Sequence, residues 1–174
     1  HGEAKAWRKI IKLRPNEPDP YFNLALTLQR SARNVEAAQM YLKAMELYED
    51  GIKHWAYAAA AACDMLEQPD CRDTPKPEWW NDEGLKALSA RVVAVKPDKP
   101  STCAMRAHVL SGDALCHRSW NAGPRTAGEI KEAATWFRRA ARACHSADTQ
   151  KRDEQNANAC DDVADNLLAK EEAE

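Results

Sequence analysis

Glycine and proline are scarce in this chain of 174 residues, with 6 and 9 copies, and the prolines cluster between stretches that lack them. Alanine, by contrast, occurs 32 times. Because Ala is the strongest helix former and is small enough for close helix crossings, this composition predicts an all-α protein. A chain of this length can bury a sizeable core as a single domain.

The sequence also lacks a strong charge of either sign and any long apolar run. Its formal net charge is −2 and its pI is about 6.3, whereas nucleic-acid binders normally carry a basic face. The apolar run over residues 56–62 is far shorter than the roughly 20 residues needed to span a bilayer. We therefore expect neither a nucleic-acid partner nor a membrane span.

Sequence motifs of catalysis and metal binding are missing as well. The chain contains no Gly-rich phosphate loop, no HExxH, no GxSxG and no CxxC spacing. Cys116–His117 and Cys144–His145 are adjacent pairs, and neighbouring side chains on a helix point about 100° apart, so such pairs chelate poorly. The sequence predicts a protein that is not an enzyme and has no metal site and no cofactor.

What the chain does contain is a helical-hairpin pattern over residues 18–49. Four residues fall on one face of a first helix, namely Tyr21, Leu24, Ala25 and Leu28, and three on one face of a second, namely Ala37, Tyr41 and Ala44. This order resembles the tetratricopeptide repeat, a 34-residue helix-turn-helix unit. The resemblance implies an α-solenoid of antiparallel helical hairpins whose concave face binds other proteins.

Extended along the chain, the resemblance predicts one domain over residues 1–174 that contains five segments. Residues 3–15 are either the second helix of a truncated first unit, whose opening helix is missing, or a lone N-terminal capping helix. The remaining segments are a second unit (18–50), a third unit (52–97) with an inserted loop (64–77), a fourth unit (100–145) and a C-terminal capping helix (148–171).

The sequence also predicts where individual helices begin and end. Asp19 and Pro20 fit the N-cap and first helical position of one helix. Helices are further expected from about Pro77 to Lys96 and over residues 102–117. Thr126 and Glu129 have the spacing of a capping box at the start of a later helix.

A partner-binding groove follows from the resemblance alone, because in this family fixed positions of each first helix line the concave face. Carried over residue by residue, these positions give ten candidate residues: Asp19, Phe22, Leu26, Gln29, Arg30, Lys53, Ala56, Ala60, Asp64 and His108. Phe22 and Leu26 would form an apolar floor, and the charged residues would guide a peptide or helix. The alternative is that the protein's own chain covers this surface.

Cysteines and tryptophans supply two further candidate features. Cys63 and Cys71 flank the inserted loop and could form a disulfide, and so could Cys144 and Cys160 on two later helices. Free cysteines that fill helix interfaces are the alternative. Trp79 and Trp80 are adjacent, so one indole either docks a partner or is covered by the loop.

Together these features predict a non-catalytic protein–protein interaction scaffold that binds a protein partner through a peptide or helix in its groove. The alternative is a structural subunit of a large multiprotein complex. Such a subunit would dock through its two loops (64–77 and 119–125) and an exposed tryptophan rather than through the groove.

Overall fold

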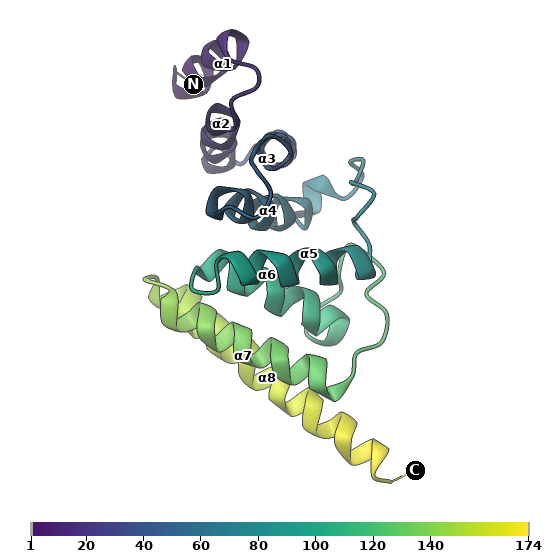
Figure 1. Ribbon diagram of the computed structural model, residues 1–174. Helices are drawn as coiled ribbons and strands as arrows, with labels where there is room; N and C mark the ends of the chain where they lie inside the picture. Colours follow the sequence, from purple (N-terminus) through teal and green to yellow (C-terminus); the bar gives the residue numbers. More distant parts are fainter. Residues whose placement is uncertain (1, 174) are drawn as a thin grey trace. The chain divides into compact units, whose positions relative to one another are not determined.

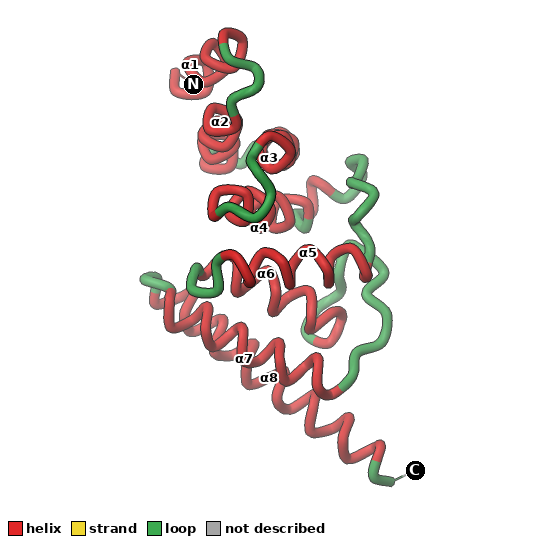
Figure 2. Tube along the Cα trace, in the orientation of Figure 1, coloured by secondary structure: helices red, strands yellow, loops and turns green. Residues whose placement is uncertain are grey.

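The computed structural model describes residues 2–173, and the regular secondary structure of this part of the chain is entirely helical. Eight α-helices and two short 3₁₀ helices follow one another, and the described residues contain no strand (Figures 1 and 2). The predicted all-α class is therefore confirmed. The described chain divides into two compact units, one up to Lys76 and one from Pro77 onward. The single domain predicted for residues 1–174 stays a prediction.

The first unit contains four α-helices joined by short turns. They are α1 (Gly2–Leu13), α2 (Pro18–Arg30), α3 (Asn34–Leu47) and α4 (Lys53–Leu66), followed by the 3₁₀ helix η1 (Pro69–Cys71). Each α-helix packs on the next one along the chain, so α3 contacts both α2 and α4 (Figure 1). This shared support fixes α2 and α4 relative to each other.

Helix α2 begins one proline earlier than the sequence predicts. Glu17 is its N-cap and Pro18 its first residue, so the prediction of Asp19 as N-cap is wrong. Proline suits the first helical position because its φ is already helical and because the N–H it lacks would be unpaired there. Pro20 lies in the same first turn, where a missing N–H also costs no helical hydrogen bond.

The core of the first unit depends on small residues of α4. Five alanines of this helix are buried, together with large side chains at its two ends, Trp55 and Leu66. Alanine side chains let α4 approach α3 closely, which keeps large residues such as Tyr41 fully covered. The described residues include no helix long and apolar enough to cross a membrane.

The second unit contains the other four α-helices. They are α5 (Asp82–Val95), α6 (Pro100–Ser111), α7 (Ala127–Ala143) and α8 (Ala147–Glu171), with the 3₁₀ helix η2 (Gly112–Ala114) directly after α6. Here too consecutive helices pack on each other. A long loop joins α6 to α7, whereas a short turn joins α7 to α8 as an antiparallel hairpin (Figure 2).

The start of α5 differs from the prediction, because the helix begins at Asp82 and not near Pro77. Asn81 is its N-cap and accepts a hydrogen bond from the Gly84 backbone N–H at 2.9 Å. The backbone of Trp79 folds tightly against this first turn. A Cβ on Gly84 would lie 2.3 Å from the Trp79 carbonyl oxygen, so only glycine fits there.

The end of α6 also differs, because the helix stops at Ser111 rather than continuing to residue 117. Gly112 follows with a φ of +51°, a left-handed conformation that suits glycine and ends a helix. At the other end of the loop, the predicted capping box is confirmed. Thr126 and Glu129 each bond the other's backbone N–H at the start of α7.

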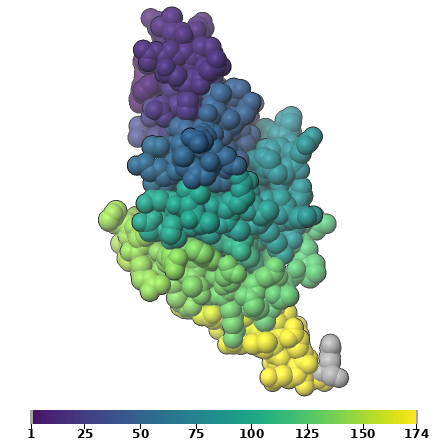
Figure 3. Space-filling view, viewed as in Figure 1, coloured from purple at the N-terminus to yellow at the C-terminus, as the bar shows by residue number. Residues whose placement is uncertain are grey.

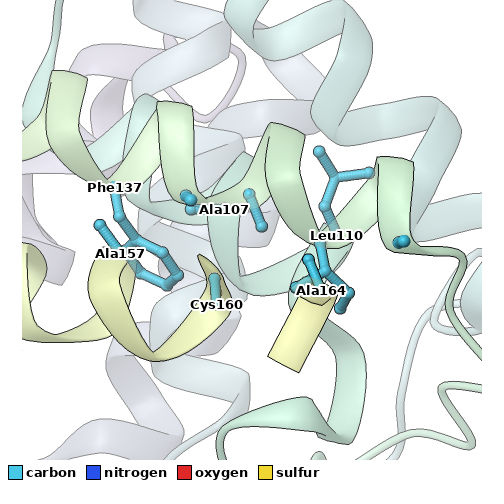
Figure 4. Close-up of a cluster of buried hydrophobic side chains, with 10 residues drawn as sticks. Ala107, Leu110, Phe137, Ala157, Cys160 and Ala164 are labelled. Atoms are coloured by element: carbon cyan, nitrogen blue, oxygen red, sulfur yellow. The ribbon is translucent and has the colours of Figure 1, made fainter. Parts of the chain in front are cut away.

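The core of the second unit lies between α6, α7 and α8 (Figure 4). Phe137 of α7 is its largest fully buried member, and small side chains of α6 and α8 surround it. In Figure 4 the side chains of Ala157, Cys160 and Ala164 all point from α8 toward this cluster. Their spacing of three and four residues produces a single apolar stripe along α8.

Candidate functional site

Nine of the ten predicted groove residues lie in the first unit, on α2 and α4, which both pack on α3. We call these nine residues the α2–α4 surface: Asp19, Phe22, Leu26, Gln29, Arg30, Lys53, Ala56, Ala60 and Asp64. The tenth, His108, lies on α6 in the second unit.

The nine residues differ in how far they reach solvent. The four charged ones are exposed, namely Asp19, Arg30, Lys53 and Asp64, and three are half-buried, namely Phe22, Leu26 and Gln29. Ala56 and Ala60 are buried, with 0% and 3% of their surface exposed. The two alanines therefore contribute to the core and offer almost no surface to a partner.

A continuous chain of aromatic rings runs from α2 across α3 to α4. The Phe22 ring meets Tyr41 edge-on, with centroids 5.3 Å apart, and Tyr48 edge-on at 6.5 Å. Tyr48 stacks on His54 at 5.7 Å, and His54 meets Tyr57 edge-on at 6.0 Å. We call these five residues the ring chain. Edge-on contacts of this kind are favourable beyond the area they bury.

A hydrogen bond joins the ring chain to the middle of the α2–α4 surface. The Tyr41 hydroxyl donates to Gln29 Oε1 at 2.7 Å. Burial raises the pKa of Tyr41 to about 12, and the nearby Asp64 carboxylate adds to the increase while Arg30 opposes it. The hydroxyl therefore stays a donor, and it fixes the orientation of the Gln29 carboxamide.

A second hydrogen bond joins the ring chain to the start of α2. The Tyr48 hydroxyl donates to Asp19 Oδ1 at 2.5 Å. Burial raises the pKa of Tyr48, and the hydrogen bond and negative charge of Asp19 raise it further. Charge-assisted hydrogen bonds of this kind are stronger than neutral ones, so the bond holds the end of α3 against α2.

Four members of the ring chain were missed as site residues by sequence reasoning. The carried-over positions come only from the first helix of each unit, whereas Tyr41 and Tyr48 belong to α3 and its end. His54 and Tyr57 are on α4 but at other positions. The signal was present, because aromatic residues recur at short intervals between Tyr41 and Tyr57.

His108 is half-buried in the second unit. Its ring lies edge-on against Phe137 at 5.0 Å, and Arg118 Nη2 lies 3.0 Å from its Nδ1. Burial lowers the pKa of His108 to about 3, and the charges of Arg118 and Arg152 lower it as well. His108 is therefore neutral at ordinary pH, with Nδ1 accepting the bond from Arg118.

Trp79 and Trp80 lie in the turn before α5 and are both half-buried. Their rings are 6.0 Å apart, and Trp80 meets Trp120 edge-on at 5.8 Å. Trp120 belongs to the loop before α7, and its indole N–H donates to Asp82 at 3.3 Å. The α6–α7 loop thus covers part of the tryptophan pair, and docking by either indole stays a prediction.

All six cysteines are free thiols in the structure, so neither of the two possible bridges, Cys63–Cys71 and Cys144–Cys160, is formed. Cys63, Cys71 and Cys160 are buried, and burial raises the pKa of each thiol. Buried protonated thiols react slowly. Across the described residues, no three His, Cys, Asp or Glu side chains are grouped to hold a metal ion.

Two shallow depressions lie on the second unit, on either side of Arg142. One is lined by Pro97, Asp98 and Arg139, and the other by Arg138, Glu154 and Asn158. Arg138 is already bound to Asp161 at 2.5 Å, and Arg139 lies over the Trp136 ring. Neither depression contains a predicted site residue.

The chain matches no model of a known protein family, and no curated protein sequence matches it. The functional interpretation of the α2–α4 surface and its ring chain is therefore based on their geometry alone.

Proposed function

We propose that this protein is a non-catalytic interaction scaffold built from tetratricopeptide-like hairpins, and that its α2–α4 surface binds a protein partner through a peptide or a helix. The ring chain is the observation that carries the proposal. Half-buried Phe22 and Tyr57 and exposed His54 give an apolar, rigid floor, while Tyr41 and Tyr48 support it from below. Aromatic side chains lose little entropy on binding and are enriched at interface hot spots.

Polar groups beside this floor suit the backbone of a bound chain. Because Gln29 accepts the Tyr41 hydroxyl through Oε1, its amide nitrogen faces away from that ring and can donate to a main-chain carbonyl. Arg30 and Lys53 are exposed donors, and Asp64 is an exposed acidic group. An apolar centre with a polar edge is the arrangement that peptide recognition requires.

Two substitutions in the floor and at its edge test the proposal. A peptide array probed with the purified protein selects ligands, and fluorescence anisotropy then measures their affinity. Phe22→Asp combined with Arg30→Glu is expected to weaken binding at least about tenfold, because hot-spot changes cost more than about 1.4 kcal/mol.

The control combines Gln39→Asp with Arg72→Glu, two exposed residues outside the α2–α4 surface. This variant changes charge by a similar amount and should bind the selected peptides as the wild type does. Selected peptides that bind the Phe22/Arg30 variant with unchanged affinity would refute the proposal. Helical circular dichroism of each variant shows that the fold is kept.

The rival function, a structural subunit that docks through its loops and tryptophans, has less support. The α6–α7 loop is bound to its own unit through Trp120 and Arg125. Trp79 and Trp80 are half-buried against this loop and against each other. Replacing residues 67–76 by Gly and Ser should therefore leave peptide binding intact. If the loop instead docked the protein in a complex, the same replacement would abolish assembly with that complex.

A further inference from the structure

Two exposed helix faces of opposite charge lie outside the α2–α4 surface. Three large apolar side chains are exposed on the described residues, and two of them belong to these faces. They are Leu13 at the end of α1, which is 82% exposed, and Leu168 near the end of α8, which is 37% exposed. A single exposed leucine is ordinary, but each of these lies in a helix segment of strong charge.

Helix α1 leaves an apolar row open. Ala4 is the one residue of α1 that is buried, and Ile11, two turns later, lies on the same stripe. Away from this stripe, an apolar row recurs at spacings of four and three residues and therefore shares a face: Ala6, Ile10 and Leu13. Ala6 and Leu13 are exposed, and Ile10 is half-buried.

A basic row accompanies this apolar row. Lys5, Lys9 and Lys12 are exposed, repeat at the same spacing and make no ion pair with any described residue. Over residues 2–14 the chain has five basic residues and one acidic residue, a formal charge of +4. Helix α1 thus presents an apolar row beside unpaired positive charge.

The end of α8 carries the opposite charge. With 25 residues, α8 is longer than the 17-residue α7 with which it forms a hairpin, and its last turns extend past α7 (Figure 3). Leu168 and Ala169 are exposed there. Asp165 and Glu172 lie three and four positions from Leu168, and Asp162 lies three positions before Asp165, which pairs with Lys131 at 3.6 Å. Residues 161–172 contain five acidic residues and one basic residue, a formal charge of −4.

We propose that α1 of one copy docks on the end of α8 of a second copy. The apolar rows would pack together, and the lysine row would lie against the acidic residues around Leu168. The charges that make no ion pair with any described residue are opposite in sign: Lys5, Lys9 and Lys12 on α1, and Asp162, Glu171 and Glu172 at the end of α8. Helix α1 has 12 residues and spans about 18 Å, and the stretch of α8 from Asp161 to Glu171 is about as long. Neither segment includes a residue of the α2–α4 surface, so this contact is independent of peptide binding.

Such a contact is heterologous, because different surfaces of the two copies meet. It leaves one α1 and one α8 end open in each dimer, so association continues into short chains or closes into a ring. One helix pair buries less area than a standard stable interface. Association is therefore expected only at protein concentrations of about 0.1 to 1 mM, and it should weaken with salt because the charges are exposed.

Charge reversal tests the contact by sedimentation velocity at low salt. Lys5→Glu with Lys9→Glu places acidic residues near the start of α1, and Asp162→Lys with Glu172→Lys places basic residues near the end of α8. All four positions are exposed, so the substitutions leave the buried stripes of both helices unchanged. Each variant alone should associate at least about tenfold more weakly than the wild type.

Mixing the two variants should restore association, because the acidic α1 of one then meets the basic α8 of the other. Lys43→Glu with Lys151→Glu is the matched control and should associate as the wild type does. A wild type that stays monomeric to about 1 mM, or variants whose mixture fails to associate, would overturn the proposal. A monomer that instead co-sediments with anionic phospholipid vesicles would overturn it in favour of a membrane surface for α1.

Discussion

Arg125 and Asp82 form a two-pronged ion pair that joins the residue before the N-cap of α7 to the first residue of α5. Arg125 Nη2 lies 2.5 Å from Asp82 Oδ1, and Nη1 lies 3.1 Å from Oδ2. The same guanidinium donates to the carbonyls of Val109 and Leu110 at the end of α6, each at 3.0 Å. One side chain, only 4% exposed, therefore holds three elements of the second unit together.

Replacing Arg125 by Met should destabilise the second unit by about 3 kcal/mol. Among the described residues, Asp82 would keep only Lys86, at 3.4 Å, and the Trp120 N–H as partners, and the Val109 and Leu110 carbonyls would lose their donor. Urea denaturation measures the loss. Asp82→Asn should cost a similar amount, and the double variant should cost clearly less than the two combined. Additive losses would show that the two residues act separately.

The exposed pair of Arg14 and Glu17, 3.4 Å apart, is the control, and Arg14→Met should change stability by less than about 0.5 kcal/mol. The pH dependence gives a second check. Burial by itself would raise the pKa of Asp82, but hydrogen bonds from Arg125 and Trp120 hold it below its usual value. This stabilisation is present above the unfolded pKa and is lost as the pH falls, so Arg125→Met should show a weaker acid dependence.

Gly84 and Gly128 offer a matched pair of helical glycines. A Cβ on Gly84 would lie 2.3 Å from the Trp79 carbonyl oxygen, whereas the nearest atom to a Cβ on Gly128 is 3.8 Å away. Gly84→Ala should therefore destabilise the protein by about 2 kcal/mol. Gly128→Ala should stabilise it by up to about 1 kcal/mol, because alanine restricts the unfolded chain. Thermal unfolding of both variants checks this, and equal effects would contradict the tight turn at Trp79.

Asp153 is a buried acid at a core position of α8. Only 2% of its side chain is exposed, its Oδ1 has no hydrogen-bond partner among the described residues, and Arg152 Nε lies 3.7 Å away. Burial raises its pKa. The folded state therefore binds the proton more tightly, and stability falls as the pH rises through the folded pKa.

Asp153→Asn should consequently stabilise the protein by about 1 kcal/mol at pH 7, because it removes a poorly compensated charge. The gain should vanish near pH 3, where the acid is protonated in both states. Urea denaturation at the two pH values separates this effect from a change in packing. A gain of the same size at both would assign it to packing instead.

Local helix signals were readable from the sequence, and tertiary contacts were not. The capping box at Thr126 depends on residues three apart, and it formed as predicted. The start of α5 also has a local cap at Asn81, but it depends on the close approach of Trp79 to Gly84 as well, and the end of α6 depends on the backbone conformation of Gly112. Neither is visible in periodicity.

The candidate surface shows the same division. Its nine residues were selected by their positions within the repeat, and they do lie on the helices α2 and α4. The rings of Tyr48 and His54 were missed, because their stacking depends on how the end of α3 meets α4. Burial of Ala56 and Ala60 likewise depends on helix packing, which residue spacing alone does not set.

His108 should make the second unit sensitive to acid below neutral pH. Its folded pKa is about 3, against an unfolded value of 6.5, so the unfolded chain binds more protons between these values. The stabilisation that comes from a neutral His108 is fully present above about pH 6.5. It falls as the pH decreases, by about 2 kcal/mol between pH 7.5 and pH 5. Protonation would also place a charge on Nδ1, which accepts the hydrogen bond from Arg118.

The raised pKa of Asp153 acts on stability in the opposite direction, so the measurement is best made in Asp153→Asn protein. There, His108→Gln should lower stability at pH 7.5, because glutamine packs less well against Phe137. It should also flatten the pH dependence between pH 7.5 and pH 5, since no imidazole remains to titrate. A slope that persists unchanged in the Gln variant would assign the acid sensitivity to other groups.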